Sequence, residues 1–395
     1  MKRTGVMFAL MTIFLVLPYA ASSAEVPGVT DTEVFVGIST PLSGPAALWG
    51  VTAWGAKAWA DHVNQNGGVH GRQIKMIIKD DGYNPTRTVT NYAEMKGKVF
   101  AIMNQIGSAC CSANKDSFFE NKIIGFSCMC NVRIWADQPP EKRKWVFAAY
   151  PDYEDEGEFM AKYAVEKLGS KKIGIFYQND DYGKTALPGV KKAIEGKAAL
   201  VAEVPHEVTD TGMGPHALKL KESGADAVIL YTNPKHAALI TKEMAKADYT
   251  PKRVANFTLA DRIMYDIAKS PWEGTYVVLA ANSGIPGSDP KADKILDTLI
   301  KQNPEIKGKE WLGLFGAVNM IQFAEALKRT GRDLNAETFT KAVETMKGWK
   351  PEGVGAGVTY GPGQHHGVNG FQMGQAKDGK IIPIEKEFTL AKPRF

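Results

Sequence analysis

The four cysteines of the chain lie close together, in the stretch CCSANKDSFFENKIIGFSCMC at 110–130. Cys110 and Cys111 form one pair, and Cys128 and Cys130 form the other. Such a cluster could bind copper(I) or zinc, act as a redox pair, or join two loops through disulfides. The C-C and C-x-C spacings differ from the C-x-x-C of ordinary zinc and thiol-redox sites, which favours disulfides.

The N-terminus indicates the compartment in which these cysteines lie. Lys2 and Arg3 precede an apolar run at 6–17, and small residues lead to Ala24. This pattern predicts a secretory signal peptide over 1–24, cleaved after Ala24. The run is too short to span a bilayer comfortably, so we expect an exported chain. An oxidising environment then favours one or two bridges from Cys110 or Cys111 to Cys128 or Cys130, with a thiolate metal site as the alternative.

Motifs for catalysis are missing from the sequence that follows the signal. It contains no G-x-S-x-G, H-E-x-x-H, G-x-G-x-x-G or G-x-x-x-x-G-K-[ST] pattern, and His365-His366 is the one adjacent histidine pair. The net charge is only +5 over 395 residues, and the charged side chains are scattered. We therefore expect neither an enzyme nor a nucleic-acid partner, and no metal at the two histidines.

The surrounding sequence alternates β-rich runs with amphipathic helical stretches. EVFVGIST (33–40) and QIKMIIK (73–79) are strands of the first half, while KIGIFY (172–177) and DAVILY (226–231) belong to a second half with the same rhythm. This alternation predicts an α/β fold of two doubly wound parallel-sheet lobes. In such folds, ligands bind beyond the carboxyl ends of the strands.

Several side chains at these strand ends could bind a small molecule. They are aromatic or neutral and polar, as small-molecule clefts usually are. Those singled out on this basis are Trp49, Ser112, Tyr182, Asn233, Phe257 and Thr258. Trp49 could equally pack into the core, and Ser112 could simply cap a helix predicted near 113–121.

Five motifs follow one another along the chain. They are, in order, PLSGPAALWG, NQNGGVHGRQIKMIIKDDGYNPTRT, IGSACCSAN, IFYQNDDYGKTALPGV and LKESGADAVILY. Together they resemble the periplasmic solute-binding proteins of the leucine/isoleucine/valine-binding type, over nearly the whole chain. The resemblance implies a monomeric periplasmic receptor without a cofactor, which binds a small molecule and delivers it to an ATP-binding-cassette permease in the inner membrane. It also implies a hinge of three crossings, with lobes at 25–147 plus 277–355 and at 148–276 plus 356–395, and a ligand cleft between them.

The family pattern assigns roles to particular positions. Trp49 would flank the ligand and Ser112 would bind its carboxylate. Met129 and Asn131 would complete that half, while Tyr182 would close from the other lobe, with Asn233 and Thr258 in the last two positions. Amino-acid binders of this family place a carboxylate near Thr258 to pair with the ligand's ammonium, but the nearest acid here is Asp261. A small organic or aromatic acid or an amide is therefore expected rather than a branched-chain amino acid.

Overall fold

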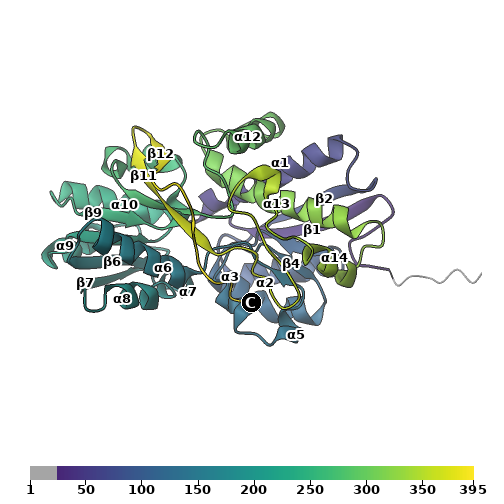
Figure 1. Ribbon diagram of the computed structural model, residues 1–395, viewed down its shortest axis with the longest axis horizontal. Coiled ribbons are helices and arrows are strands. Elements are labelled where there is room, and N and C mark those ends of the chain that lie inside the picture. Colours follow the sequence, from purple (N-terminus) through teal and green to yellow (C-terminus); the bar gives the residue numbers. More distant parts are fainter. Residues whose placement is uncertain (1–24) are drawn as a thin grey trace, which may run out of the picture.

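The computed structural model describes residues 25–395, so the predicted signal peptide lies outside the described residues. Figure 1 shows two lobes side by side, one built mainly from purple-blue and green segments and the other mainly from teal segments. Within residues 25–395, no helix is both long and apolar enough to cross a bilayer.

The first lobe is built around a five-stranded, fully parallel sheet. Its strands run in the order β2 (Gln73–Asp80), β1 (Glu33–Thr40), β3 (Ala101–Met103), β4 (Ile124–Phe126) and β5 (Val146–Phe147). Its helices are α1 (Val51–Gln65), α2 (Pro85–Met95), α3 (Ser108–Glu120), α4 (Arg133–Ala136), α5 (Pro140–Arg143), α12 (Pro290–Gln302), α13 (Glu310–Thr330) and α14 (Ala336–Val343).

The second lobe is built around an eight-stranded sheet. Its strands are β12 (Lys380–Pro383), β11 (Gly370–Lys377), β10 (Tyr276–Ala280), β9 (Lys252–Ala255), β8 (Ala227–Tyr231), β6 (Lys172–Gln178) and β7 (Ala199–His206), with β13 (Thr389–Leu390) beside β11. Its helices are α6 (Tyr153–Lys162), α7 (Asp181–Lys184), α8 (Leu187–Ile194), α9 (Gly214–Glu222), α10 (Pro234–Lys246) and α11 (Ile263–Ala268). The predicted α/β fold of two doubly wound lobes is confirmed, but β11 and its partners add an antiparallel edge that the prediction lacked.

The chain passes between the two sheets three times. The connections follow β5, β10 and α14, and the last of them leads into β11. Two of the lobe boundaries proposed from the sequence fall within these connections. The boundary at 276/277 falls instead inside β10, which belongs to the second sheet as far as Ala280.

Helices α1 and α13 pack against each other at unusually short range because glycines lie at their contact. A Cβ on Gly55 would lie 1.9 Å from the carbonyl oxygen of Gly313, and one on Gly316 would lie 1.9 Å from that of Thr52. No larger side chain fits between these two backbones. This close packing holds the start of α13 next to the first sheet, where it faces the second lobe.

Helices begin directly after strands where the sequence supplies a cap. Asn84 caps α2 ahead of Pro85, and Asn233 caps α10 ahead of Pro234, each with its side chain accepting a backbone N–H. Asp180 caps α7 in the same way, as expected for QNDDYG. These caps bring loops and helix starts to the carboxyl ends of both sheets.

Candidate functional site

A cavity of about 30 Å³ lies between the carboxyl ends of the two sheets. The first lobe contributes Ala46, Trp49, Tyr83, Ile106, Gly107, Ser108 and Met129. The opposite wall consists of Tyr150, Tyr153, Gln178, Tyr182, Asn233 and Thr258. This volume accommodates little more than a water molecule or two.

The start of α3 provides hydrogen-bond donors on the first-lobe side. The first backbone N–H groups of this 13-residue helix have no partner within the helix, and its dipole favours a negative charge there. Ser108, the first residue, accepts a hydrogen bond of 3.0 Å from the backbone N–H of Asn131 through its Oγ. Because this bond uses the oxygen as an acceptor, the Ser108 hydroxyl hydrogen is free to donate to a ligand.

Tyr83 lies beside this helix start in a strained backbone conformation. Its φ is +62°, in the left-handed region, and its ring packs so close to Gly107 that a Cβ there would lie 2.7 Å from it. The Tyr83 hydroxyl accepts a 3.3 Å hydrogen bond from Gln178 Nε2 across the interface between the lobes. Burial raises the pKa of Tyr83 well above its ordinary value, so the phenol stays protonated and can donate.

The orientation of Gln178 follows from a chain of buried groups behind the cavity wall. His236 holds Asn233 Oδ1 through its backbone N–H (3.3 Å) and Nδ1 (3.0 Å). Asn233 Nδ2 therefore points to Gln178 Oε1, at 2.9 Å. Gln178 Nε2 must then face Tyr83 and also Asp180 Oδ2, which is 2.6 Å away. The chain thus has one polarity, which directs donors toward the first lobe.

The second-lobe wall is hydrogen-bonded within itself. The Tyr182 hydroxyl lies 2.9 Å from Thr258 Oγ1, donates to the Thr232 carbonyl at 3.2 Å and accepts from Asn256 Nδ2. Burial raises the pKa of Tyr182, so it too remains a neutral phenol. This wall offers neutral hydroxyl and amide groups but no charge to a ligand.

Aromatic side chains close one end of the cavity. Trp49 is 5% exposed and makes edge contacts with Phe257, Trp311 and Phe315 at centroid distances of 6.5, 6.2 and 6.1 Å. It lies in a 3-10 turn, η1 (Ala47–Gly50), ahead of α1. Both roles considered for Trp49 are therefore compatible with its position, since it is a core residue that also lines the cavity.

In the part of the chain that the structure describes, the cavity lining includes no Asp, Glu, Lys or Arg. Glu156 is buried behind the second-lobe wall, where it accepts hydrogen bonds of 2.7 Å from the Tyr231 hydroxyl and from the Phe257 backbone N–H. Burial raises the pKa of its carboxyl to about 8. Asp261 instead bonds the start of α13 in the other lobe. Neither acid is placed to pair with a ligand's ammonium.

Five of the eight ligand-binding residues expected from the sequence line the cavity, namely Trp49, Met129, Tyr182, Asn233 and Thr258. Asn131, Phe257 and Ser112 do not. Asn131 supports Ser108 and donates to Thr185 Oγ1 at 3.0 Å, and Phe257 is fully buried. Ser112 lies one turn inside α3, because this helix begins at Ser108 rather than near 113.

Sequence reasoning missed Ser108, Tyr83 and Gln178. The loop that contains Tyr83 was recognised as a strand end, but no feature of DDGYNP predicts that a tyrosine adopts a left-handed conformation there. Gln178 is the last residue of β6 and lies within the motif IFYQNDDYGKTALPGV, in which Tyr182 was the residue singled out. The serine in the motif IGSACCSAN was assigned one turn too late.

A sequence-family model described as "Periplasmic binding protein" matches residues 33–380. The chain belongs to the periplasmic binding protein family. A curated relative, Leu/Ile/Val-binding protein homolog 3 of Brucella melitensis, is 21% identical over 359 residues, which cover 89% of this chain and 94% of the relative. The relatives matched are solute-binding proteins, as the sequence motifs indicated.

Solved structures share the fold of this periplasmic binding protein. A fatty acid ABC transporter substrate-binding protein from Thermomonospora curvata has a TM-score of 0.81 at 23% identity, covering 93% of this chain and 95% of its own. A branched chain amino acid ABC transporter protein from Thermus thermophilus with bound valine has a TM-score of 0.82 at 16% identity, covering 91% and 97%. At these identities the likeness concerns the fold.

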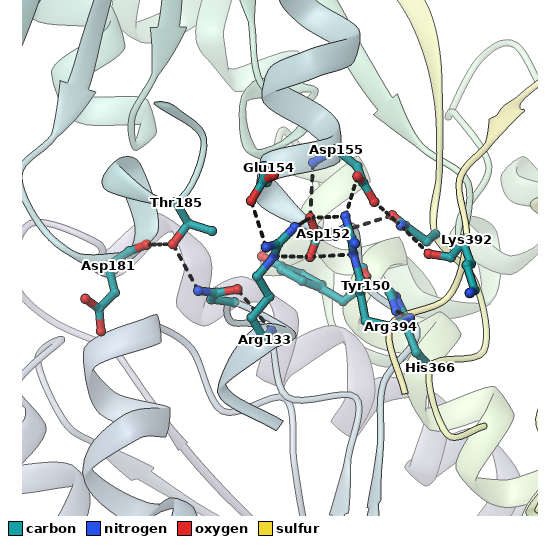
Figure 2. Close-up of polar contacts among 12 residues, drawn as sticks. Arg133, Tyr150, Asp152, Glu154, Asp155, Asp181, Thr185, His366, Lys392 and Arg394 are labelled. Carbon is teal, nitrogen blue, oxygen red and sulfur yellow. Dashed lines mark hydrogen bonds and ion pairs between the residues drawn. The ribbon is translucent and has the colours of Figure 1, made fainter. Parts of the chain in front are cut away.

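An ionic network lies where the chain of this periplasmic binding protein first crosses between the lobes. Figure 2 shows Arg133 and Arg394 approaching the carboxylate of Asp152 from two sides. Asp152 is fully buried and accepts from Arg133 Nε at 2.9 Å and from Arg394 Nη2 at 3.2 Å. Arg133 also pairs with Glu154 of α6 at 2.7 Å, and Arg394 pairs with Asp155. The first lobe, the crossing and the C-terminal segment are thus joined by one buried carboxylate.

The expectation of disulfides is not met. Cys110, Cys111, Cys128 and Cys130 are all free and buried. Cys110 and Cys111 lie in the first turn of α3, and the thiol of Cys111 is beside those of Cys128 and Cys130. Burial raises the pKa of Cys110 to about 12 and also raises those of Cys111 and Cys130. These thiols pack as small apolar groups in the wall behind Met129.

The metal-delivery alternative is likewise not supported by the geometry. Over residues 25–395, no group of three or more His, Cys, Asp or Glu side chains is arranged to hold a metal ion. His365 and His366 diverge: His365 Nε2 contacts Glu344 at 3.1 Å, while His366 Nε2 donates to the Tyr150 carbonyl at 2.8 Å. The stretch GPGQHHGVNG leads from α14 into β11, and both of its histidines are buried.

Proposed function

We propose that this periplasmic binding protein is the receptor of an ATP-binding-cassette importer and that its ligand is a small organic acid that carries no ammonium group. The ligand binds between the lobes, which open to admit it and close around it, and the closed receptor delivers it to a permease in the inner membrane. The chain performs no chemistry on the ligand. Family membership and the names of the structural relatives support the transport role.

The choice of an acid as the ligand rests on the hydrogen-bond donors on the first-lobe side of the cavity. On the first-lobe side, the Ser108 hydroxyl, the Tyr83 hydroxyl and the start of α3 can all donate hydrogen bonds to a ligand. A carboxylate accepts such bonds with charge assistance. A buried ammonium would need an acceptor of opposite charge, and the lining has none.

The size of the ligand that fits depends on how far the aromatic side chains at one end of the cavity can move. The closed cavity of about 30 Å³ suits only a very small acid, so a larger one requires Trp49 and its neighbours to move or the lobes to close less completely. A fatty acid is the substrate class named for one structural relative, and valine is the ligand named for another. Both belong in a test of this chain.

Isothermal titration calorimetry on the purified chain, first unfolded and refolded to remove retained ligand, tests the proposal. The panel is acetate, propionate, benzoate and octanoate, each paired with its amide, together with leucine and valine. We expect at least one acid to bind at least tenfold more tightly than its amide and than either amino acid. Tighter binding of leucine or valine than of every acid would contradict the choice of ligand while leaving the transport role intact.

A further inference from the structure

A buried carboxyl group of the second lobe, that of Asp261, contacts the first turn of α13, the longest helix of the first lobe. Asp261 follows a 3-10 turn, η3 (Phe257–Leu259), and is 2% exposed. Its Oδ2 accepts a 2.9 Å hydrogen bond from the backbone N–H of Leu312 in the first turn of α13. Its Oδ1 accepts a local bond of 2.8 Å from the Ile263 N–H.

Helix α13 has no cap of its own at this end. Lys309 occupies the N-cap position and makes no side-chain hydrogen bond to the helix. A 21-residue helix leaves its first N–H groups unsatisfied and favours negative charge there. Asp261 thus performs the function of an N-cap, but from the other lobe and 51 residues away in sequence.

We propose that Asp261 is an interlobe latch, a carboxyl group that caps α13 only when the lobes are closed and so links closure to its own protonation. The inference rests on the proposed closure of the lobes, not on the identity of the ligand. Opening would expose both the carboxyl group and the first N–H groups of α13 to water.

The charged groups around the latch are few. Glu310, on α13, faces Asp261 and disfavours its negative charge. Arg262, next to Asp261, approaches Glu310 Oε2 only to 4.0 Å and is largely exposed. A cavity of about 370 Å³ borders the site, with Arg262, Glu310 and Trp311 among its lining residues.

The direction of the linkage follows from burial. Desolvation outweighs the bonds from Ile263 and Leu312 and raises the pKa of Asp261 to about 6, compared with 3.8 for a solvated aspartate. Between these values the closed state binds a proton that the open state does not. Acidification from pH 7 to pH 4 is therefore expected to raise the ratio of closed to open molecules by about 50-fold.

Small-angle X-ray scattering of the ligand-free chain between pH 7 and pH 4.5 tests the latch, with circular dichroism to verify folding. We expect the wild type to contract as the pH falls. Asp261→Asn, which keeps an acceptor without the charge, should be compact throughout, whereas Asp261→Ala should be more open throughout. Asp266→Asn, which removes an exposed carboxylate from the same segment, should behave as the wild type.

Comparison with Asp261→Asn separates the latch from other groups that titrate in this range, such as His366 in the hinge, whose pKa burial lowers to about 4. The latch is contradicted by a wild type whose radius of gyration does not change, or by equal contraction of the wild type and Asp261→Asn. It is also contradicted if Asp261→Ala is no more open than the wild type. Because no ligand is present, these outcomes are independent of whether an organic acid binds.

Discussion

At the scale of single residues, the site is defined by which hydrogen-bonding atoms remain unused. Ser108 Oγ and the Tyr83 hydroxyl each accept one hydrogen bond from the protein, and each keeps its hydroxyl hydrogen available to donate into the cavity. The chemistry of the cavity therefore depends on backbone and amide groups that do not touch the ligand. This explains why a list of residue types alone describes the site incompletely.

The two serines of α3 offer a direct test of the ligand geometry. Ser108→Ala removes a donor from the cavity and is expected to weaken binding of the best acid in the calorimetric panel by about tenfold or more, because hydrogen bonds to charged groups contribute about 1.5–3 kcal/mol. Ser112→Ala, on the same helix but outside the lining, should leave the affinity unchanged. The reverse result would restore the assignment made from the motif.

Glu156 gives a second test at this scale, through the pH dependence of stability. Its carboxyl has a pKa of about 8 in the folded protein and 4.5 ordinarily, so between these values the folded state holds a proton that the unfolded chain releases. Stability should therefore fall as the pH rises from 5 to 8, by on the order of 4 kcal/mol. In urea unfolding, Glu156→Gln should remove most of this fall; equal slopes in both proteins would contradict the argument.

The residues that sequence reasoning placed correctly share a simple property. Trp49, Met129, Tyr182, Asn233 and Thr258 lie in segments that follow strands with clear apolar patterns, so their position near the sheet edge follows from the strands. The roles of Ser108 and Asp261 were not predicted. That of Ser108 depends on where α3 begins, and that of Asp261 depends on a partner in the other lobe. The free thiols of the cysteine cluster show that proximity in sequence and an exported chain do not by themselves establish a bridge.

At the scale of elements, the alternation of strands and helices predicted both sheets, because parallel strands buried on both faces are nearly continuous apolar runs. The antiparallel edge formed by β11, β12 and β13 was not predicted. Strand β11 pairs with β10 although α12, α13 and α14 lie between them in sequence, and its partners β12 and β13 are short. Edge strands of this kind carry little periodic signal.

The contact between α1 and α13 should be the most sensitive helix interface to small additions. In Gly316→Ala, the new Cβ would meet the backbone carbonyl of Thr52, which cannot move without separating the helices. We expect a loss of about 3 kcal/mol in the free energy of unfolding, measured with urea, at the upper end for overpacking. The matched change Gly212→Ala, at a position with no atom within 4 Å, should alter it by less than about 0.5 kcal/mol.

At the scale of the whole molecule, several groups of contacts join the lobes around a small cavity, and the hydrogen bond from Asn131 Nδ2 to Thr185 Oγ1 is one of them. The ionic network at Asp152 lies on the hinge side, the bond between Gln178 and Tyr83 lies at the cavity, and Asp261 joins α13. Of these last three contacts, only the bond between Gln178 and Tyr83 involves residues that line the cavity. The contacts at Asp152 and Asp261 thus join the lobes at points away from the cavity lining.

The hinge network yields the last prediction, which concerns the coupling of the lobes. Asp152→Asn removes the carboxylate shared by Arg133 and Arg394 and leaves two partly buried guanidinium groups without it. Breaking one partner of a buried pair typically costs 3–5 kcal/mol, so we expect a loss of about 3 kcal/mol at pH 7, measured by urea unfolding.

The pH dependence of this loss distinguishes an ionic role from a packing role. Despite its burial, Asp152 has a pKa below its ordinary value, because Arg133, the Asp155 N–H and Arg394 favour the charged form. Its contribution is therefore present above the ordinary pKa of about 4 and is lost as the pH falls through the lower value in the folded protein. The difference in the free energy of unfolding between Asp152→Asn and the wild type should therefore become smaller in acid.

Glu154→Gln, which removes a single more exposed partner of Arg133, should cost less than about 1 kcal/mol. A loss for Asp152→Asn that is the same at pH 7 and in acid would show that shape, rather than charge, holds the hinge.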